Sequence, residues 1–174
     1  SWNDDAATRY RIAIRDSATP NISTQKSWPN APKVFASLPG KRGVEAITIR
    51  DCKCREEDLR RLGEVPDLKT LVFERVKFDG AGLHTLGQAQ QLLSVECDNC
   101  PTLSDAGLRG IGTCASLKQL ILVNCPSVTD EGIMAVAKGC PRLQRLSARS
   151  TGATGAVTVK LQNTLPQCDI EVTE

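Results

Sequence analysis

Hydrophobic residues recur along the chain in short segments where apolar and polar positions alternate. The frame L-x-x-L-x-L appears at steps of 24, 24, 25 and 26 residues, and its copies begin at Val44, Leu68, Leu92, Leu117 and Leu143. A partial sixth copy keeps Ile170 and Val172. An alternation of period 2 is typical of a strand with one buried face. We therefore predict a short strand in each copy.

The segments between these strands have the pattern of short helices. They span residues 55–63, 80–87, 104–112, 129–139 and 154–163. The N-termini of the third and fourth of these helices are near copies of each other. In the third helix Ser104 or Asp105 can accept hydrogen bonds from the N–H groups of the first turn, and in the fourth Thr129 or Asp130 can do so. Each unit is then strand, turn, helix, turn.

A unit of this size cannot bury its apolar strand face and its apolar helix stripe alone, so it must stack on its neighbours. We predict an α/β solenoid with a parallel sheet on the concave side. The helices lie on the convex side, because they need about twice the spacing of strands.

Three stretches share a longer pattern, which includes Asn-Cys-Pro or Gly-Cys-Pro. They are residues 97–108, 124–133 and 139–146. This pattern resembles the cysteine-containing leucine-rich repeats typical of F-box leucine-rich proteins. The resemblance implies a leucine-rich repeat solenoid, a right-handed β-α superhelix, with about five repeats plus a partial one over residues 44–174. Val76 and Thr151 replace the usual cysteine after the strand, so we expect irregular turns there.

Residues 1–43 differ in composition and are predicted to form an N-terminal capping segment. This region holds four of the six aromatic residues, Trp2, Tyr10, Trp28 and Phe35. Large aromatic side chains are efficient covers for the open end of a solenoid. Residues 10–14 alternate like an extra edge strand, and residues 33–38 have the pattern of a helix. The segment has no F-box pattern, so we do not expect ubiquitin-ligase recruitment.

Most of the eight cysteines fall on repeat positions: Cys52, Cys97, Cys100, Cys114, Cys125 and Cys140. We interpret them as reduced, buried structural thiols, with Cys54 the most reactive. That implies an intracellular, reducing compartment, the cytoplasm ahead of the nucleus or the mitochondrial matrix. The spacings Cys52-x-Cys54 and Cys97-x-x-Cys100 suit metal ligands, but strand alternation sends such pairs to different places. We predict no metal and no cofactor.

Charge and chemistry exclude several function classes. The net charge is +2, which argues against a nucleic-acid partner, and no apolar run approaches the roughly 18 residues of a membrane span. His84 is the single histidine, expected on an exposed helix face, and no lysine followed by serine or threonine follows the glycine-rich residues 152–155. We therefore predict that the chain is not an enzyme. Because the first residue is Ser1, we expect a processed protein or a piece of a larger chain or complex.

The outward strand positions are the predicted functional surface. Their order runs from acidic through apolar to basic, and exposed Ile121 and Val123 suit an anchor for a partner's apolar side chain. The candidate partner-binding residues are Arg50, Val72, Glu74, Glu96, Asp98, Gln119, Ile121, Val123, Arg145 and Arg149. We predict a non-catalytic module that binds a protein partner as a scaffold, adaptor or recognition domain.

An alternative rests on the residues Ile-Arg-Asp-Cys-Lys-Cys at 49–54 and on the size of the chain. In these features the chain is similar to coupling factor B of the mitochondrial ATP synthase, a short leucine-rich repeat protein with functional thiols. That resemblance implies a small mitochondrial factor.

Overall fold

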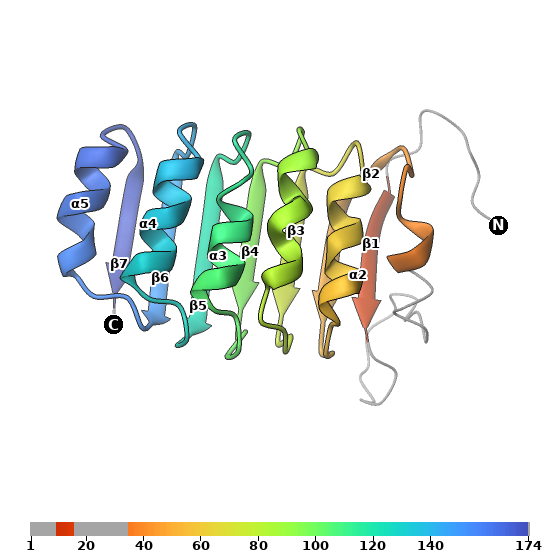
Figure 1. The fold of residues 1–174 in the computed structure, drawn as a ribbon, viewed down its shortest axis with the longest axis horizontal. Coiled ribbons are helices and arrows are strands. Elements are labelled where there is room, and N and C mark those ends of the chain that lie inside the picture. Colours follow the sequence, from red (N-terminus) through yellow and green to blue (C-terminus); the bar gives the residue numbers. More distant parts are fainter. Residues whose placement is uncertain (1–9, 16–34, 174) are drawn as a thin grey trace.

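The computed structural model describes residues 10–15 and 35–173, and within them seven parallel strands form one sheet in chain order (Figure 1). The strands are β1 (Tyr10–Arg15), β2 (Val44–Arg50), β3 (Thr70–Glu74), β4 (Ser94–Asp98), β5 (Gln119–Cys125), β6 (Arg145–Thr151) and β7 (Asp169–Thr173). Helices cover one side of this sheet, and the other side is open. The predicted α/β solenoid, with a parallel sheet on one side and helices on the other, is confirmed.

The helices occupy the predicted segments. They are α2 (Glu56–Arg60), η1 (Arg61–Glu64), η2 (Ala81–Gln88), α3 (Asp105–Ile111), α4 (Asp130–Gly139) and α5 (Ala156–Thr164). The first segment divides into α2 and the 3₁₀ turn η1, and the second, η2, is 3₁₀ throughout. Gly80, with φ of 92°, precedes η2, and two glycines within η2 weaken its helical preference.

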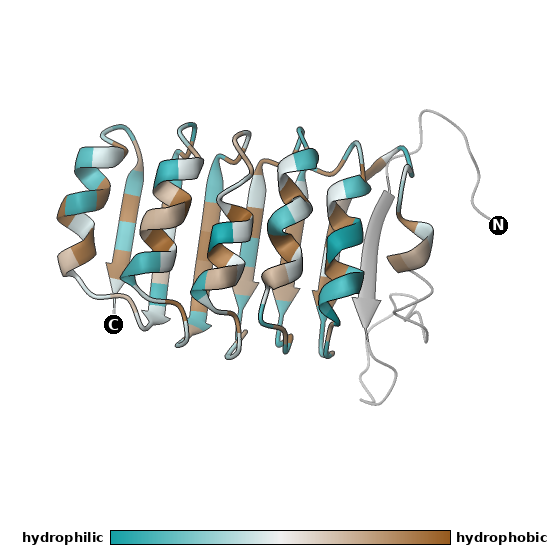
Figure 2. Cartoon of the chain, in the orientation of Figure 1, coloured by the Kyte–Doolittle hydropathy of each residue, from teal (hydrophilic) through white to brown (hydrophobic). Residues whose placement is uncertain are grey.

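The core lies between the sheet and the helix layer, and the repeat period builds it in rows. Leu71, Val95, Leu120 and Leu146 pair in register across β3 to β6, and each is 0% exposed. Figure 2 shows the corresponding recurrence of hydrophobic residues along the helices and strands. Each repeat therefore shields the apolar face of its neighbours, as the stacking argument requires.

The chain repeats one backbone conformation at or just beyond the C-terminal end of the strands β2 to β6. Asp51, Arg75, Asn99, Asn124 and Ser150 all have φ between 51° and 54°. The expected irregularity beside Val76 and Thr151 is wrong, because the residues before them adopt the same left-handed conformation. Backbone hydrogen bonds set this turn, as when the N–H of residue 75 donates to the carbonyl of residue 98 over 2.8 Å.

Side chains at the helix starts link one repeat to the next. Ser104 and Thr129 cap α3 and α4, each accepting from an N–H two residues later at 3.3 Å. The carboxylate of Asp105 instead accepts from the N–H and hydroxyl of Thr129, at 2.8 and 2.6 Å. Asp130 binds Thr154 in the same way, at 2.6 and 2.8 Å. The hydroxyls are thus the caps, and the carboxylates join successive repeats.

Glycines let neighbouring helices approach to backbone contact. A Cβ added to Gly139 would overlap the carbonyl oxygen of Gly112, and one added to Gly110 would lie 2.8 Å from the backbone nitrogen of His84. We expected helices to need about twice the strand spacing, but the missing side chains allow closer packing here. This recurrence of glycine at matching helix positions stops at α5, where Val157 lies 25 residues after Gly132.

The N-terminal region contributes a strand to the sheet. The predicted edge strand is confirmed as β1, which pairs in parallel with β2 and places Ile12 in register with Ile47. Residues 35–37 are helical, and Phe35 and Leu38 are buried in the core. Residues 1–9 and 16–34, with Trp2 and Trp28, lie outside the described residues. The capping role of residues 1–43 stays a prediction.

Candidate functional site: the open face of the sheet

The open face of the sheet carries all ten predicted site residues. We call these ten side chains, on β2 to β6, the sheet face. Strand register arranges them in three rows: Gln119 and Arg145; Val72, Glu96 and Ile121; and Arg50, Glu74, Asp98, Val123 and Arg149. Arg145 and Arg149 are exposed and the other eight are half-buried. The structure thus brings residues that are up to 99 positions apart in the chain onto one surface.

An ion pair divides the acidic part of this face. The Nη2 of Arg50 lies 3.2 Å from the Oε1 of Glu74, and both side chains are about 30% exposed (30% and 27%). The sequence alone places Glu74 with Glu96 and Asp98 in the acidic part of this face, but Arg50 neutralises Glu74. The acidic area is therefore centred on β4, where Asp98 also accepts a 2.8 Å hydrogen bond from the amide of Asn99.

The middle of the face is apolar. Ile121 and Val123 on β5 stand in register with Glu96 and Asp98 on one side, and Val123 with Arg149 on the other. Among the described residues, neither Arg149 nor Arg145 has an ion-pair partner. The two half-buried apolar side chains therefore lie between the carboxylates on β4 and the guanidinium groups on β6. No salt bridge joins these two sets of charges within the described residues.

One outward position of β6 is covered. Strand alternation places Ser147 between the two arginines and in register with Ile121 on the open face, yet it is only 1% exposed. Its hydroxyl donates a 2.9 Å hydrogen bond to the carboxylate of Glu171 on β7. A serine is short enough to be covered by its longer neighbours, which the strand alternation alone does not reveal.

The thiols are placed largely as predicted. All eight cysteines lie in the described part of the chain; seven are buried and Cys168 is half-buried. Burial raises the pKa of the Cys140 thiol to about 12. The expectation that Cys54 is the most reactive is wrong: Cys54 is 6% exposed, and a hydrogen bond with Cys52, Sγ to Sγ 3.7 Å, together with burial raises its pKa far above the ordinary value.

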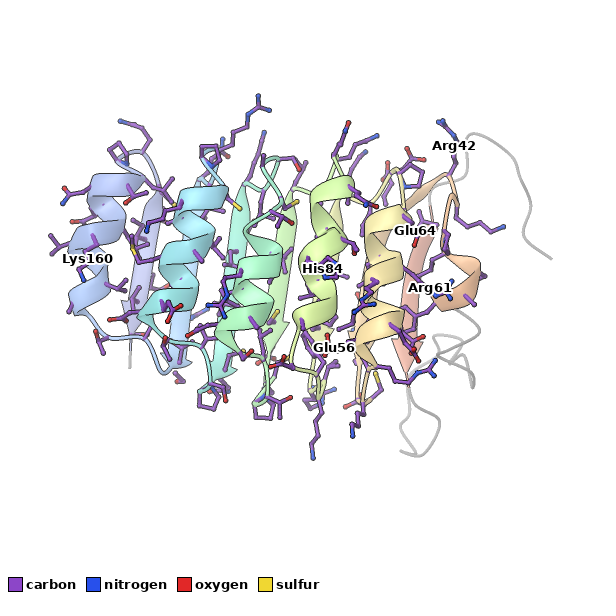
Figure 3. All side chains as sticks on the ribbon, viewed as in Figure 1. Arg42, Glu56, Arg61, Glu64, His84 and Lys160 are labelled. Atoms are coloured by element: carbon purple, nitrogen blue, oxygen red, sulfur yellow. The ribbon has the colours of Figure 1, made fainter. Side chains whose placement is uncertain are left out.

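The lone histidine lies away from the sheet face. Figure 3 shows His84 on η2, in the helix layer in front of the sheet, and its Nδ1 is 2.8 Å from the carbonyl oxygen of Ala81. Its side chain is exposed, as expected. Within residues 10–15 and 35–173, no three His, Cys, Asp or Glu side chains are grouped so that they could hold a metal ion. The helices of this described part are too short and too polar to cross a membrane.

Comparisons with known proteins find similar chains among solved structures only. No protein-family model matches the chain, and no curated protein does. Among solved structures, the chain is similar to a leucine-rich repeat protein of Leptospira interrogans, with 17% identity and a TM-score of 0.48. The match covers 74% of this chain and 30% of that protein, so the chain spans less than a third of its length.

Proposed function

We propose that the chain is a non-catalytic protein-interaction module that binds a protein partner through the sheet face. It would act as a scaffold, an adaptor or the recognition domain of a larger assembly. The observation that carries the proposal is the half-buried pair Ile121 and Val123, flanked by carboxylates on β4 and exposed arginines on β6.

This combination favours a protein over other partners. Apolar side chains near the centre of an interface lose the most water on contact and contribute most of the affinity. Unpaired charges of both signs around them steer the encounter and fix the register. A polyanion would be repelled by Glu96 and Asp98, whereas a peptide can offer basic, apolar and acidic side chains together.

The geometry sets the spacing that the partner must match. Neighbouring strands lie about 4.8 Å apart, so Asp98 and Arg149, which are separated by β5, are about 10 Å apart across the sheet. The proposed partner surface therefore presents a basic and an acidic group about 10 Å apart, with an apolar side chain between them.

The test compares one substitution on the sheet face with the same kind of substitution on the helix side. Ile121→Asp should reduce the amount of partner protein that co-purifies with the chain from its native source. It should also weaken the affinity of the purified partner for the chain. The matched control is Val159→Asp, because Val159 on α5 is 64% exposed and is also a β-branched apolar residue. Arg145→Glu should weaken binding most at low salt. If both Ile121→Asp and Arg145→Glu remain folded and bind as wild type does, the sheet face is not the interface.

Two finer assignments have no support from the comparisons: the F-box class of repeats and the likeness to coupling factor B. A mitochondrial factor with reactive thiols also fits poorly with Cys52 and Cys54, which are both buried. The complete coding sequence distinguishes these candidates, since an upstream transit peptide favours the mitochondrial factor and further domains favour the scaffold.

A further inference from the structure

From β4 to β6 the charges of the sheet face change sign across the strands, but they keep one sign along each strand. On β4, Glu96 and Asp98 are both carboxylates. On β6, Arg145 and Arg149 are both guanidinium groups, and the apolar pair on β5 lies between the two sets. A partner segment that pairs with both sets must therefore carry its basic and acidic groups along a direction that crosses the strands.

The spacing of the strands selects the conformation of a segment that crosses them. The strands β4, β5 and β6 lie side by side (Figure 1), and neighbours are about 4.8 Å apart, so β4 and β6 are about 10 Å apart. In an α-helix, residues i and i+7 lie about 10.5 Å apart along the axis, with i+3 and i+4 about halfway between them. Same-face residues of an extended segment recur about every 6.6 Å, so two steps span about 13 Å and pass beyond β6. A crossing helix therefore matches the three strands, and an extended segment does not.

The apolar pair on β5 also has the width of a helix face. Ile121 and Val123 are alternate residues of β5, so they lie about 6.6 Å apart along the strand. The apolar stripe of a helix includes the two adjacent positions i+3 and i+4, which lie on either side of its midline. When the helix axis crosses the strands, each of these two positions covers one of the half-buried side chains on β5.

The charged positions at the two ends of this crossing are free to pair. Among the described residues, Arg145 and Arg149 have no ion-pair partner. Ser147 between them is 1% exposed, so it does not protrude between the two guanidinium groups. A carboxylate above Ser147 can therefore accept hydrogen bonds from both arginines. On β4, a lysine or arginine of the partner likewise meets the carboxylates of Glu96 and Asp98.

We propose that the sheet face binds an amphipathic α-helix of the partner protein that lies across β4, β5 and β6. The helix carries a basic residue over β4, two adjacent apolar residues over β5 and an acidic residue over β6, at positions i, i+3, i+4 and i+7. This spacing reads the same from either end, so it holds for both directions of the helix. The inference rests on the proposed function, because it names the partner element that occupies the same face.

The experiment titrates the full chain with fluorescent peptides and follows anisotropy. The helix-spaced peptide has lysine, two leucines and glutamate at i, i+3, i+4 and i+7, with alanine and glutamine elsewhere. The strand-spaced peptide has the same composition, with the same four residues at alternate positions. The helix-spaced peptide should bind at least about tenfold more tightly. Its far-ultraviolet circular dichroism should gain helical signal on binding, since short free helices are marginally stable in water.

Two variants of the chain test where this peptide lies. Ile121→Asp should weaken its binding, whereas Val159→Asp on the helix side should leave binding unchanged. A third peptide with glutamine in place of lysine and glutamate should bind wild type about threefold or more weakly than the helix-spaced peptide. The double variant Glu96→Lys and Arg149→Glu should remove that difference. Among the described residues, neither of these two side chains has a hydrogen bond or an ion pair, so the double variant should fold normally.

The outcomes separate this inference from the proposed function. Equal binding of the helix-spaced and strand-spaced peptides, or no measurable binding of the helix-spaced peptide, would overturn the helix. If Ile121→Asp still weakens binding of the native partner in that case, the sheet face is the interface and its occupant is not a helix. If Ile121→Asp changes the affinity of neither the native partner nor the peptide, the proposed function and this inference both fail.

Discussion

The contact between α3 and α4 allows a sharp test of helix packing, because adding a single methyl group at this contact should force the two helices apart. In Gly139→Ala, the new Cβ overlaps the carbonyl oxygen of Gly112 and lies 2.8 Å from its carbonyl carbon and 3.3 Å from its Cα. These are backbone atoms, so no side-chain rotation relieves the overlap. The two helices must move apart, which disturbs the packed layer beneath them.

The magnitude follows from two opposing effects. Overpacking costs typically about 1 to 3 kcal/mol, and the upper end applies when backbone atoms are in the way. Replacing a helical glycine with alanine offsets this by up to about 1 kcal/mol through helix propensity. The net loss is about 2 kcal/mol, or a fall in Tm of about 4 to 8 °C for a domain of this size.

Gly155→Ala is the matched control with the opposite sign. A Cβ at Gly155 has no atom within 4 Å, and its backbone, with φ of −56°, suits alanine. This variant should gain about 0.4 to 1 kcal/mol by restricting the unfolded chain. Urea unfolding followed by far-ultraviolet circular dichroism measures both variants. If Gly139→Ala is as stable as wild type, the backbone contact between α3 and α4 is not close. The same conclusion follows if Gly155→Ala lowers the free energy of unfolding as much as Gly139→Ala does.

Two other predictions use the core and its thiols. Leu120→Ala or Leu146→Ala should lower the free energy of unfolding by about 2 to 5 kcal/mol, because each side chain is 0% exposed, and unchanged urea midpoints would show that the strand register is misplaced. In native protein a thiol reagent should label Cys168 first, and rapid labelling of six or more thiols would contradict their burial. The Cys140 thiol has a pKa raised from 9.0 to about 12. Its contribution to stability is therefore present below pH 9 and is lost between pH 9 and pH 12, so wild type should lose more stability over that range than Cys140→Ala does.

The repeat period was sufficient to predict strands, helices and the residues of the sheet face. Leu120 and Leu146 could be placed in the core because they recur at matching positions of successive frames, and Ile121 and Arg145 follow from strand alternation. Positions 24 residues apart in neighbouring strands also meet, so the ion pair between Arg50 and Glu74 was implicit in the same period. Pairing charges across repeats would have found it.

Other features depend on atoms that no period describes. Whether a methyl group fits at Gly139 or at Gly155 depends on the local approach of one backbone to another, although both are glycines at helix ends. Ser147 is buried because a glutamate on the next strand binds it, and Cys168 is the more accessible thiol because it lies beside the last strand, where no further repeat follows within the described residues.

The carboxylates that join successive repeats have a consequence for how the chain folds during synthesis. Asp105 and Asp130 each bind a threonine 24 residues later, so the acceptor leaves the ribosome before its donor. Contacts this close in sequence close short loops, which favours fast folding. At about 5 to 20 residues per second, a new repeat becomes available about every 1 to 5 seconds and finds the preceding one already folded. The solenoid can therefore grow in one direction, with each completed repeat acting as the template on which the next one docks.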